Sequence, residues 1–212
     1  MNMRNVNIVA RYESKLLRRD IVFLGFVVIA LVGISLWQMI KQGRVNVFWY
    51  KVALPSSFPF FSMYYYNLVQ VLIALFVCME VVYRERKKDA MEVFLCRPFR
   101  NSEYCIGRFL GIFRMFLFVN ICVLLVCMYI NLWVVGAPFN VWIYVFYLFT
   151  LSIPTLIFVL GCALSISAMV KNRPLSVLVL GLFGLGVYFY LDEWQFGAFD
   201  FWGRNLPNMF SD

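Results

Sequence analysis

Residues 115–170 decide the fold, because "MFLFVNICVLLVCMYINLWVVGAPFNVWIYVFYLFTLSIPTLIFVLGCALSISAMV" contains no Asp, Glu, Lys or Arg. As one helix, these 56 residues would be roughly 84 Å long, nearly three times the hydrocarbon thickness of a bilayer. The run must fold back, and its one turn-like interruption is "GAPFN", where Gly and Pro interrupt a helix and Asn140 can cap the next one. We therefore predict membrane spans at 109–135 and 141–169, the second kinked at Pro154.

The composition supports a membrane location for the whole chain. Of its 212 residues, 63% are hydrophobic and 14% are charged, whereas a soluble domain has about 25% charged residues. There is no histidine, which removes the commonest general base and metal ligand. Most of the six cysteines lie in apolar runs and none forms a CxxC pair, so we interpret them as buried free thiols. A disulfide framework or a metal site is the alternative.

Three further apolar runs complete the predicted architecture. Ile21 to Ile40 has no charge and is about 30 Å long as a helix, longer than the apolar core of a signal peptide. A second span follows at 63–83, after an aromatic segment in which Tyr64, Tyr65 and Tyr66 are expected to form an interfacial belt. A last span is predicted at 175–191. The chain is thus expected to be an all-α integral membrane protein, one transmembrane domain of five spans.

The basic residues are distributed unequally between the two sides of these spans. Fifteen of the nineteen fall on the side of the N-terminus, the loop 84–108 with nearby Arg114, and the turn after span 141–169, and four fall on the other. By the positive-inside rule, the N-terminus is cytoplasmic and the tail 192–212 is external, in a multi-pass protein of the cell (inner or plasma) membrane. This distribution accounts for the net charge of +8 without nucleic acid as a partner.

The N-terminal segment 1–20 has the pattern of an amphipathic helix at the bilayer surface. Val9, Tyr12 and Leu16 recur at spacings of three and four, with Ile8 beside them, and the basic residues fall largely elsewhere. We expect the basic side to face lipid headgroups. The alternative is a generic basic anchor before a span.

The loop after span 63–83, "YRERKKDAMEVFLCRPFRNSEYCIGRFLG", is the most polar run of the chain. Its residues 84–97 predict a cytosolic helix with Met91, Phe94 and Leu95 on one side and Glu92 on the other. Water does not favour such an apolar strip, so it is expected to lie on lipid or in a groove of a partner. Pro98 ends this helix.

A new helix is predicted after the proline. Asn101 or Ser102 is expected to cap it, and Glu103 falls in its first turn, where a negative charge is favourable. This helix runs on into span 109–135. The predicted order is therefore span, cytosolic helix, proline turn, capped helix and span.

That order resembles the permease subunits of type-2 ABC transporters, over roughly residues 8–190. The opening "RYESKLLRRDIVF" also looks like the start of that family. The resemblance rests on a pattern of charged, small and aromatic positions around the loop: Glu80, Glu92, Pro98, Ser102, Glu103, Tyr104, Gly107, Arg108 and Gly111.

The resemblance implies a membrane-spanning subunit of an ABC transport complex, working as an exporter. Its partners would be a separate ABC ATPase, a second permease subunit in a homo- or heterodimer, and the lipid bilayer. The loop would hold the coupling helix that docks on the ATPase, through Ala90, Met91, Phe94, Leu95 and Arg97. Two features depart from the family. Asp89 and Ala90 stand where a Gly-Thr pair is common, and five spans instead of six lead us to expect a further apolar run beyond Asp212.

The sequence predicts no catalytic residue, bound cofactor or metal. It has no G-x-x-x-x-G-K-[ST] motif, so ATP would be used by the partner subunit and this chain is not expected to be an enzyme. An intramembrane enzyme using Glu80 with Asp192 or Glu193 is disfavoured, because these residues fall about a bilayer apart. The alternative function is a membrane anchor or scaffold.

Two predictions concern packing. Glu80 and Arg114 fall at similar depths in neighbouring spans and are predicted to pair, the alternative being that both reach separately to the cytoplasm. Gly107–Gly111 and Gly161–Ser165 are pairs of small residues that let helices approach closely, with a dimer face as the alternative.

Overall fold

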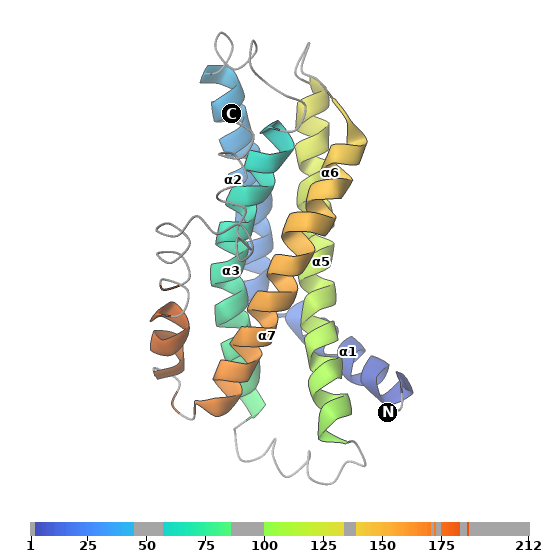
Figure 1. Ribbon diagram of the computed structural model, residues 1–212, viewed down its shortest axis with the longest axis vertical. Helices are drawn as coiled ribbons and strands as arrows, with labels where there is room; N and C mark the ends of the chain where they lie inside the picture. The colour runs from blue at the N-terminus through green and yellow to red at the C-terminus, as the bar shows by residue number, and fades with distance from the viewer. Residues whose placement is uncertain are drawn as a thin grey trace.

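The computed structural model describes residues 3–44, 57–85, 100–133, 139–170, 172, 175–182 and 186. This part of the chain is helical and contains no strand (Figure 1). In chain order, its elements are α1 (Met3–Leu17), α2 (Ile21–Arg44), α3 (Ser57–Glu85), α5 (Asn101–Trp133), α6 (Val141–Tyr147), the π-helical segment η2 (Leu148–Ser152) and α7 (Ile153–Met169).

The long helices stand side by side in a bundle, and α1 lies across one end of it (Figure 1). The axes of α1 and α2 are bent by 73° at the break between them. Asp20 stabilises this corner, because its Oδ1 accepts a hydrogen bond of 2.8 Å from the backbone N–H of Val22 at the start of α2. The N-terminal segment is therefore a helix of its own, at a steep angle to the helix that follows it.

Among the described residues, three helices are long and apolar enough to cross a membrane: Ser62–Tyr83, Asn101–Trp133 and Val141–Met169. A fourth is reached if Met3–Leu17 and Ile21–Leu36 are counted together as one bent span. The prediction of an all-helical chain with several spans is confirmed at this level. The five-span count stays a prediction, since most of 183–191 lies outside the described residues.

The helical run 141–169 has the predicted bounds and is irregular in the predicted place. Asn140 caps it, with Oδ1 accepting a 3.0 Å hydrogen bond from the backbone N–H of Trp142. The π-helical segment η2 stands directly before α7, whose first turn contains Pro154. Proline has no N–H to continue the α-helical pattern, and a widened turn accommodates this loss. The Thr155 hydroxyl bonds the carbonyl oxygen of Leu151 at 2.7 Å.

α3 begins at Ser57, six residues before the predicted span. Pro59 does not prevent this, because it lies in the first turn, where backbone N–H groups have no partner inside the helix. Tyr66 differs from the prediction as well, because its side chain is buried and does not face the membrane interface. It is 1% exposed, and its ring stacks on Phe26 of α2 with centroids 6.4 Å apart. The prediction failed because a tyrosine near the end of an apolar run can face either lipid or a neighbouring helix.

α5 is one continuous helix, so the predicted passage from the capped turn into the third span is confirmed. It begins at Asn101, whereas a cap at Asn101 or Ser102 would have placed the first helical residue after the cap. The backbone N–H of Tyr104 donates to the carbonyl oxygen of Arg100 at 3.1 Å, which places Asn101 and Ser102 inside the first turn. Glu103 lies in that turn, as predicted.

Aromatic rings join α2 to α5 in the core. Phe116 of α5 is fully buried and contacts two rings of α2. Its centroid lies 5.4 Å from that of Phe23, edge to face, and 5.7 Å from that of Phe26. Such pairs contribute about 0.5–1.5 kcal/mol each beyond burial.

Candidate functional site

The predicted ATPase-docking residues Ala90, Met91, Phe94, Leu95 and Arg97 lie outside the described residues. The structure does describe the two helix ends that flank them. α3 ends at Glu85 and α5 begins at Asn101, and both ends lie at the same end of the bundle (Figure 1). α1 packs against α5 near this end. The candidate functional site is this loop end: α1, the start of α5 and the end of α3.

α1 and α5 approach each other at two glycines. A Cβ on Gly107 would lie 2.7 Å from Cβ of Val9 and 2.8 Å from the carbonyl oxygen of Val6. A Cβ on Gly111 would lie 2.7 Å from Cβ of Glu13 and 2.8 Å from the carbonyl oxygen of Ala10. Real Cβ atoms do not come this close, so neither position can hold a side chain without moving α1. The predicted packing role of Gly107 and Gly111 is confirmed.

Hydrogen bonds connect the two helices along this contact. Asn5 Nδ2 donates to Glu103 Oε2 at 3.0 Å, at one end of the interface. Ser14 Oγ lies 3.0 Å from the carbonyl oxygen of Gly111 and 2.8 Å from that of Ala10 in its own helix. The contacts hold α1 at a fixed position along α5, because each donor reaches one particular partner.

Two carboxylates are buried in the same interface. Glu13 is 2% exposed and Glu103 is 4% exposed, and both have partners. Removing the partner of a buried charge is strongly destabilising. The interface therefore depends on specific polar contacts as well as on close packing.

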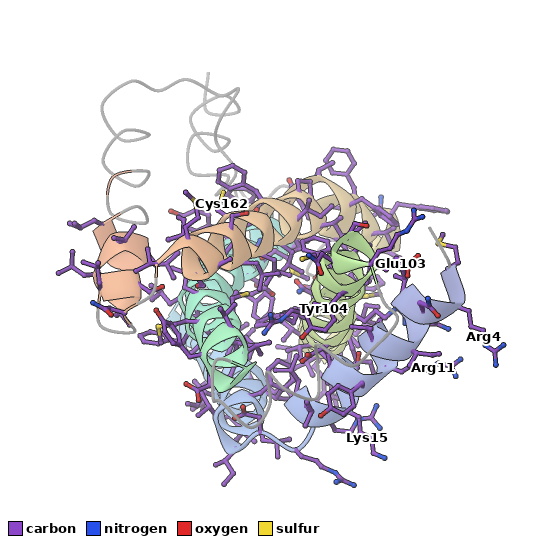
Figure 2. All side chains as sticks on the ribbon, turned by 90° about the horizontal axis from the view of Figure 1, so that it is seen from below. Arg4, Arg11, Lys15, Glu103, Tyr104 and Cys162 are labelled. Carbon is purple, nitrogen blue, oxygen red and sulfur yellow. The ribbon has the colours of Figure 1, made fainter. Side chains whose placement is uncertain are left out.

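The outer face of α1 carries its basic side chains. Arg4, Arg11 and Lys15 project away from the bundle (Figure 2), and Tyr12 and Ile8 beside them are 54% and 51% exposed. The prediction that Val9, Tyr12, Leu16 and Ile8 share one apolar face was therefore wrong, because Val9 is buried while Tyr12 and Ile8 are exposed. The buried face contains Val6, Val9, Ala10, Glu13 and Leu17, because the glycines of α5 admit the backbone and small side chains of α1.

Arg108 is buried on the side of α5 that faces the bundle. Its guanidinium carbon lies 5.9 Å from the centroid of the Tyr104 ring, a cation–π contact. At the end of α3, the Tyr83 hydroxyl donates to the carbonyl oxygen of Val170 after α7, at 3.0 Å. This hydrogen bond joins the end of α3 to the end of α7 at the loop end.

The predicted pair of Glu80 and Arg114 stays a prediction. Arg114 is exposed, and its Nη1 donates to Asn7 Oδ1 of α1 at 3.0 Å. Glu80 is half-buried on α3 and has a partner. Sequence reasoning missed the contact with Asn7, although the asparagines of α1 at positions 5 and 7 were a visible sign of a polar partner for this helix.

Other residues of chemical interest lie apart from this end. Among the described residues, no atom lies within 4 Å of a Cβ added to Gly161, so the second predicted pair of small residues, Gly161–Ser165, does not make a close contact with a described helix at that glycine. Within the described ranges, no three His, Cys, Asp or Glu side chains are grouped so that they could hold a metal ion.

Comparison with known proteins finds nothing similar. No protein-family profile, curated protein or solved structure matches this chain. The pattern of the sequence and the packing at the loop end are therefore the features that indicate a function.

The hydrogen bond between Arg114 and Asn7 gives a prediction that separates it from the pair with Glu80. Asn7→Asp should turn the bond into an ion pair and raise the midpoint of thermal unfolding in detergent by about 1–3 °C, since exposed pairs contribute about 0.2–1 kcal/mol. Adding Arg114→Gln should remove this gain. If Asn7→Asp has no effect and the exchange of Glu80→Arg with Arg114→Glu restores stability lost by each alone, the pair is Glu80 with Arg114.

Proposed function

We propose that the chain is the membrane-spanning subunit of an ABC transport complex, an exporter, that couples to a separate ATPase through the loop between α3 and α5. In this proposal it pairs with a second permease subunit, and its N-terminus and loop face the cytoplasm. ATP is bound and used by the partner.

One observation carries the proposal most directly. The amphipathic basic segment connects two long apolar helices, and the described contacts link the start of α5 to α1 and the end of α3 to the end of α7. A force that a partner applies to this segment would act on α3 and α5, and through their hydrogen bonds also on α1 and α7. This is the mechanical arrangement that transmission of force from a cytosolic partner needs.

The outer face of α1 supports the alternative function, a membrane anchor or scaffold. Its exposed basic row with Ile8 and Tyr12 beside it fits a surface of anionic headgroups. That contact is compatible with both functions, so it does not distinguish them. Binding of an ATPase does.

The deciding experiment is purification of the tagged chain in mild detergent from its native cells, with identification of the proteins that co-elute. We expect an ABC-type ATPase in stoichiometric amount. Phe94→Ala should weaken its binding by about thirtyfold or more, because apolar anchors at the centre of an interface often contribute about 2 kcal/mol or more.

Val93→Ala is the matched control for Phe94→Ala. If 84–97 is helical, Val93 lies on the side opposite to the strip of Met91, Phe94 and Leu95, and its truncation should leave binding unchanged. Co-elution of an ATPase that is equally strong in the Phe94→Ala variant would show that the strip is not the docking surface. Absence of any ATPase would favour the anchor.

A further inference from the structure

Four polar side chains are buried in the interior of the bundle, three on α3 and one on α5. Tyr66, Asn67 and Gln70 lie within about one turn of α3, and Asn120 of α5 is hydrogen-bonded to Gln70. Each is 1% exposed or less. Asn120 Nδ2 donates to Gln70 Oε1 at 2.6 Å and to the carbonyl oxygen of Phe116 at 2.8 Å.

Most of the hydrogen-bonding capacity of this cluster is unused by the described protein groups. Tyr66 Oη, both amide atoms of Asn67, Gln70 Nε2 and Asn120 Oδ1 have no hydrogen-bond partner among them. Buried polar groups in proteins are almost always bonded, to protein or to water. Lipid chains cannot supply a partner, so the missing bonds must be made inside the bundle.

The cluster is far from both ends of its helix. Gln70 is eight residues from Ser62 and thirteen from Tyr83, which bound the apolar span of α3, so it lies about 12 Å and about 20 Å from them. Water at the surface of a bilayer does not reach such a depth through packed helices. A group that satisfies these atoms must reside there.

The chemistry of the unused atoms selects the occupant. Amide N–H groups and a hydroxyl can donate, while amide and hydroxyl oxygens can accept, and none of the four side chains is charged. An isolated ion of either sign would meet groups of both polarities and no compensating charge. A small neutral molecule that both donates and accepts fits the set. We propose that Tyr66, Asn67, Gln70 and Asn120 form an internal water-binding site in the middle of the α3–α5 contact.

This site has a consequence for motion, which rests on the proposed function. The direct polar bond between the helices at this level is that of Gln70 with Asn120, and the other groups bond to water. Water can exchange hydrogen-bond partners as α3 and α5 shift. A relative movement of these helices would therefore leave no buried polar group without a hydrogen bond. Occupancy by water is a property of the chain alone and does not depend on transport.

The first test is water-edited solid-state NMR of the ¹⁵N-asparagine-labelled chain in lipid bilayers. We expect transfer of magnetisation from water to the side-chain nitrogens of Asn67 and Asn120, with signals assigned by Asn67→Leu and Asn120→Leu. Asn67→Leu should also reduce the transfer to Asn120, because both bind the same water. Val77→Ala, a truncation on the same helix away from the cluster, should not reduce it. No transfer to either asparagine overturns the proposal.

Thermal unfolding in detergent gives an independent readout. If the amide of Asn67 is dry and unbonded, Asn67→Leu removes a destabilising group of similar size, and the midpoint rises by about 2–4 °C or more. If the amide binds water, the substitution removes those bonds, and the midpoint stays unchanged or falls. A rise contradicts the water site, whether or not an ATPase partner is found.

Discussion

Gly111→Leu should detach α1 from α5. The new side chain would begin 2.8 Å from the carbonyl oxygen of Ala10 and 2.7 Å from Cβ of Glu13, and a backbone atom cannot turn aside as a flexible side chain does. Overpacking of this kind costs about 3 kcal/mol. We expect the midpoint of thermal unfolding in detergent to fall by about 6–12 °C.

The position of α1 can be measured directly in the same variant. Asn5 and Glu103 are hydrogen-bonded across the interface, so cysteines at these two positions should be joined by a short thiol-reactive cross-linker in the parent chain. Gly111→Leu should abolish most of this cross-link. The matched control is Gly161→Leu, where an added Cβ meets no atom of the described part of the chain within 4 Å. A Gly111→Leu chain that cross-links normally and unfolds at the parent temperature would contradict the close contact.

Phe116→Ala should separate α2 from α5. The ring is fully buried, and it is lost together with its contacts to Phe23 and Phe26. Burial from water contributes little here, because the surrounding lipid is itself apolar, so the loss is one of packing and ring–ring contact. We expect a destabilisation of about 3 kcal/mol, seen as earlier thermal unfolding.

Phe118→Ala is the control for that substitution. Phe118 lies two residues further along α5 and is 62% exposed, so its removal deletes the same atoms without opening a cavity. Its unfolding temperature should remain close to that of the parent. Equal effects of the two substitutions would mean that Phe116 does not join the helices as described.

Much of the architecture could be read from the sequence. An uncharged run of 56 residues cannot be one span, so its length required a reversal, and the turn residues of "GAPFN" predicted its place near 136–140. Asn140 and Pro154 then determined where the next helix begins and where it is irregular, because capping and the missing N–H of proline are local properties. The continuous α5 followed in the same way from the absence of any helix breaker between its first turn and its apolar run.

Only the tertiary structure decided which helix packs against which face of its neighbours. The spacing of Gly107 and Gly111 indicated that a helix comes close, but any helix could have filled that place, and the partner is α1. Likewise, Tyr66 and Gln70 are buried although their residue types allow an interfacial position. A sequence pattern states which side chains share a face of one helix. The burial of that face depends on a neighbour that is distant along the chain, and its position follows from the packing of all the helices together.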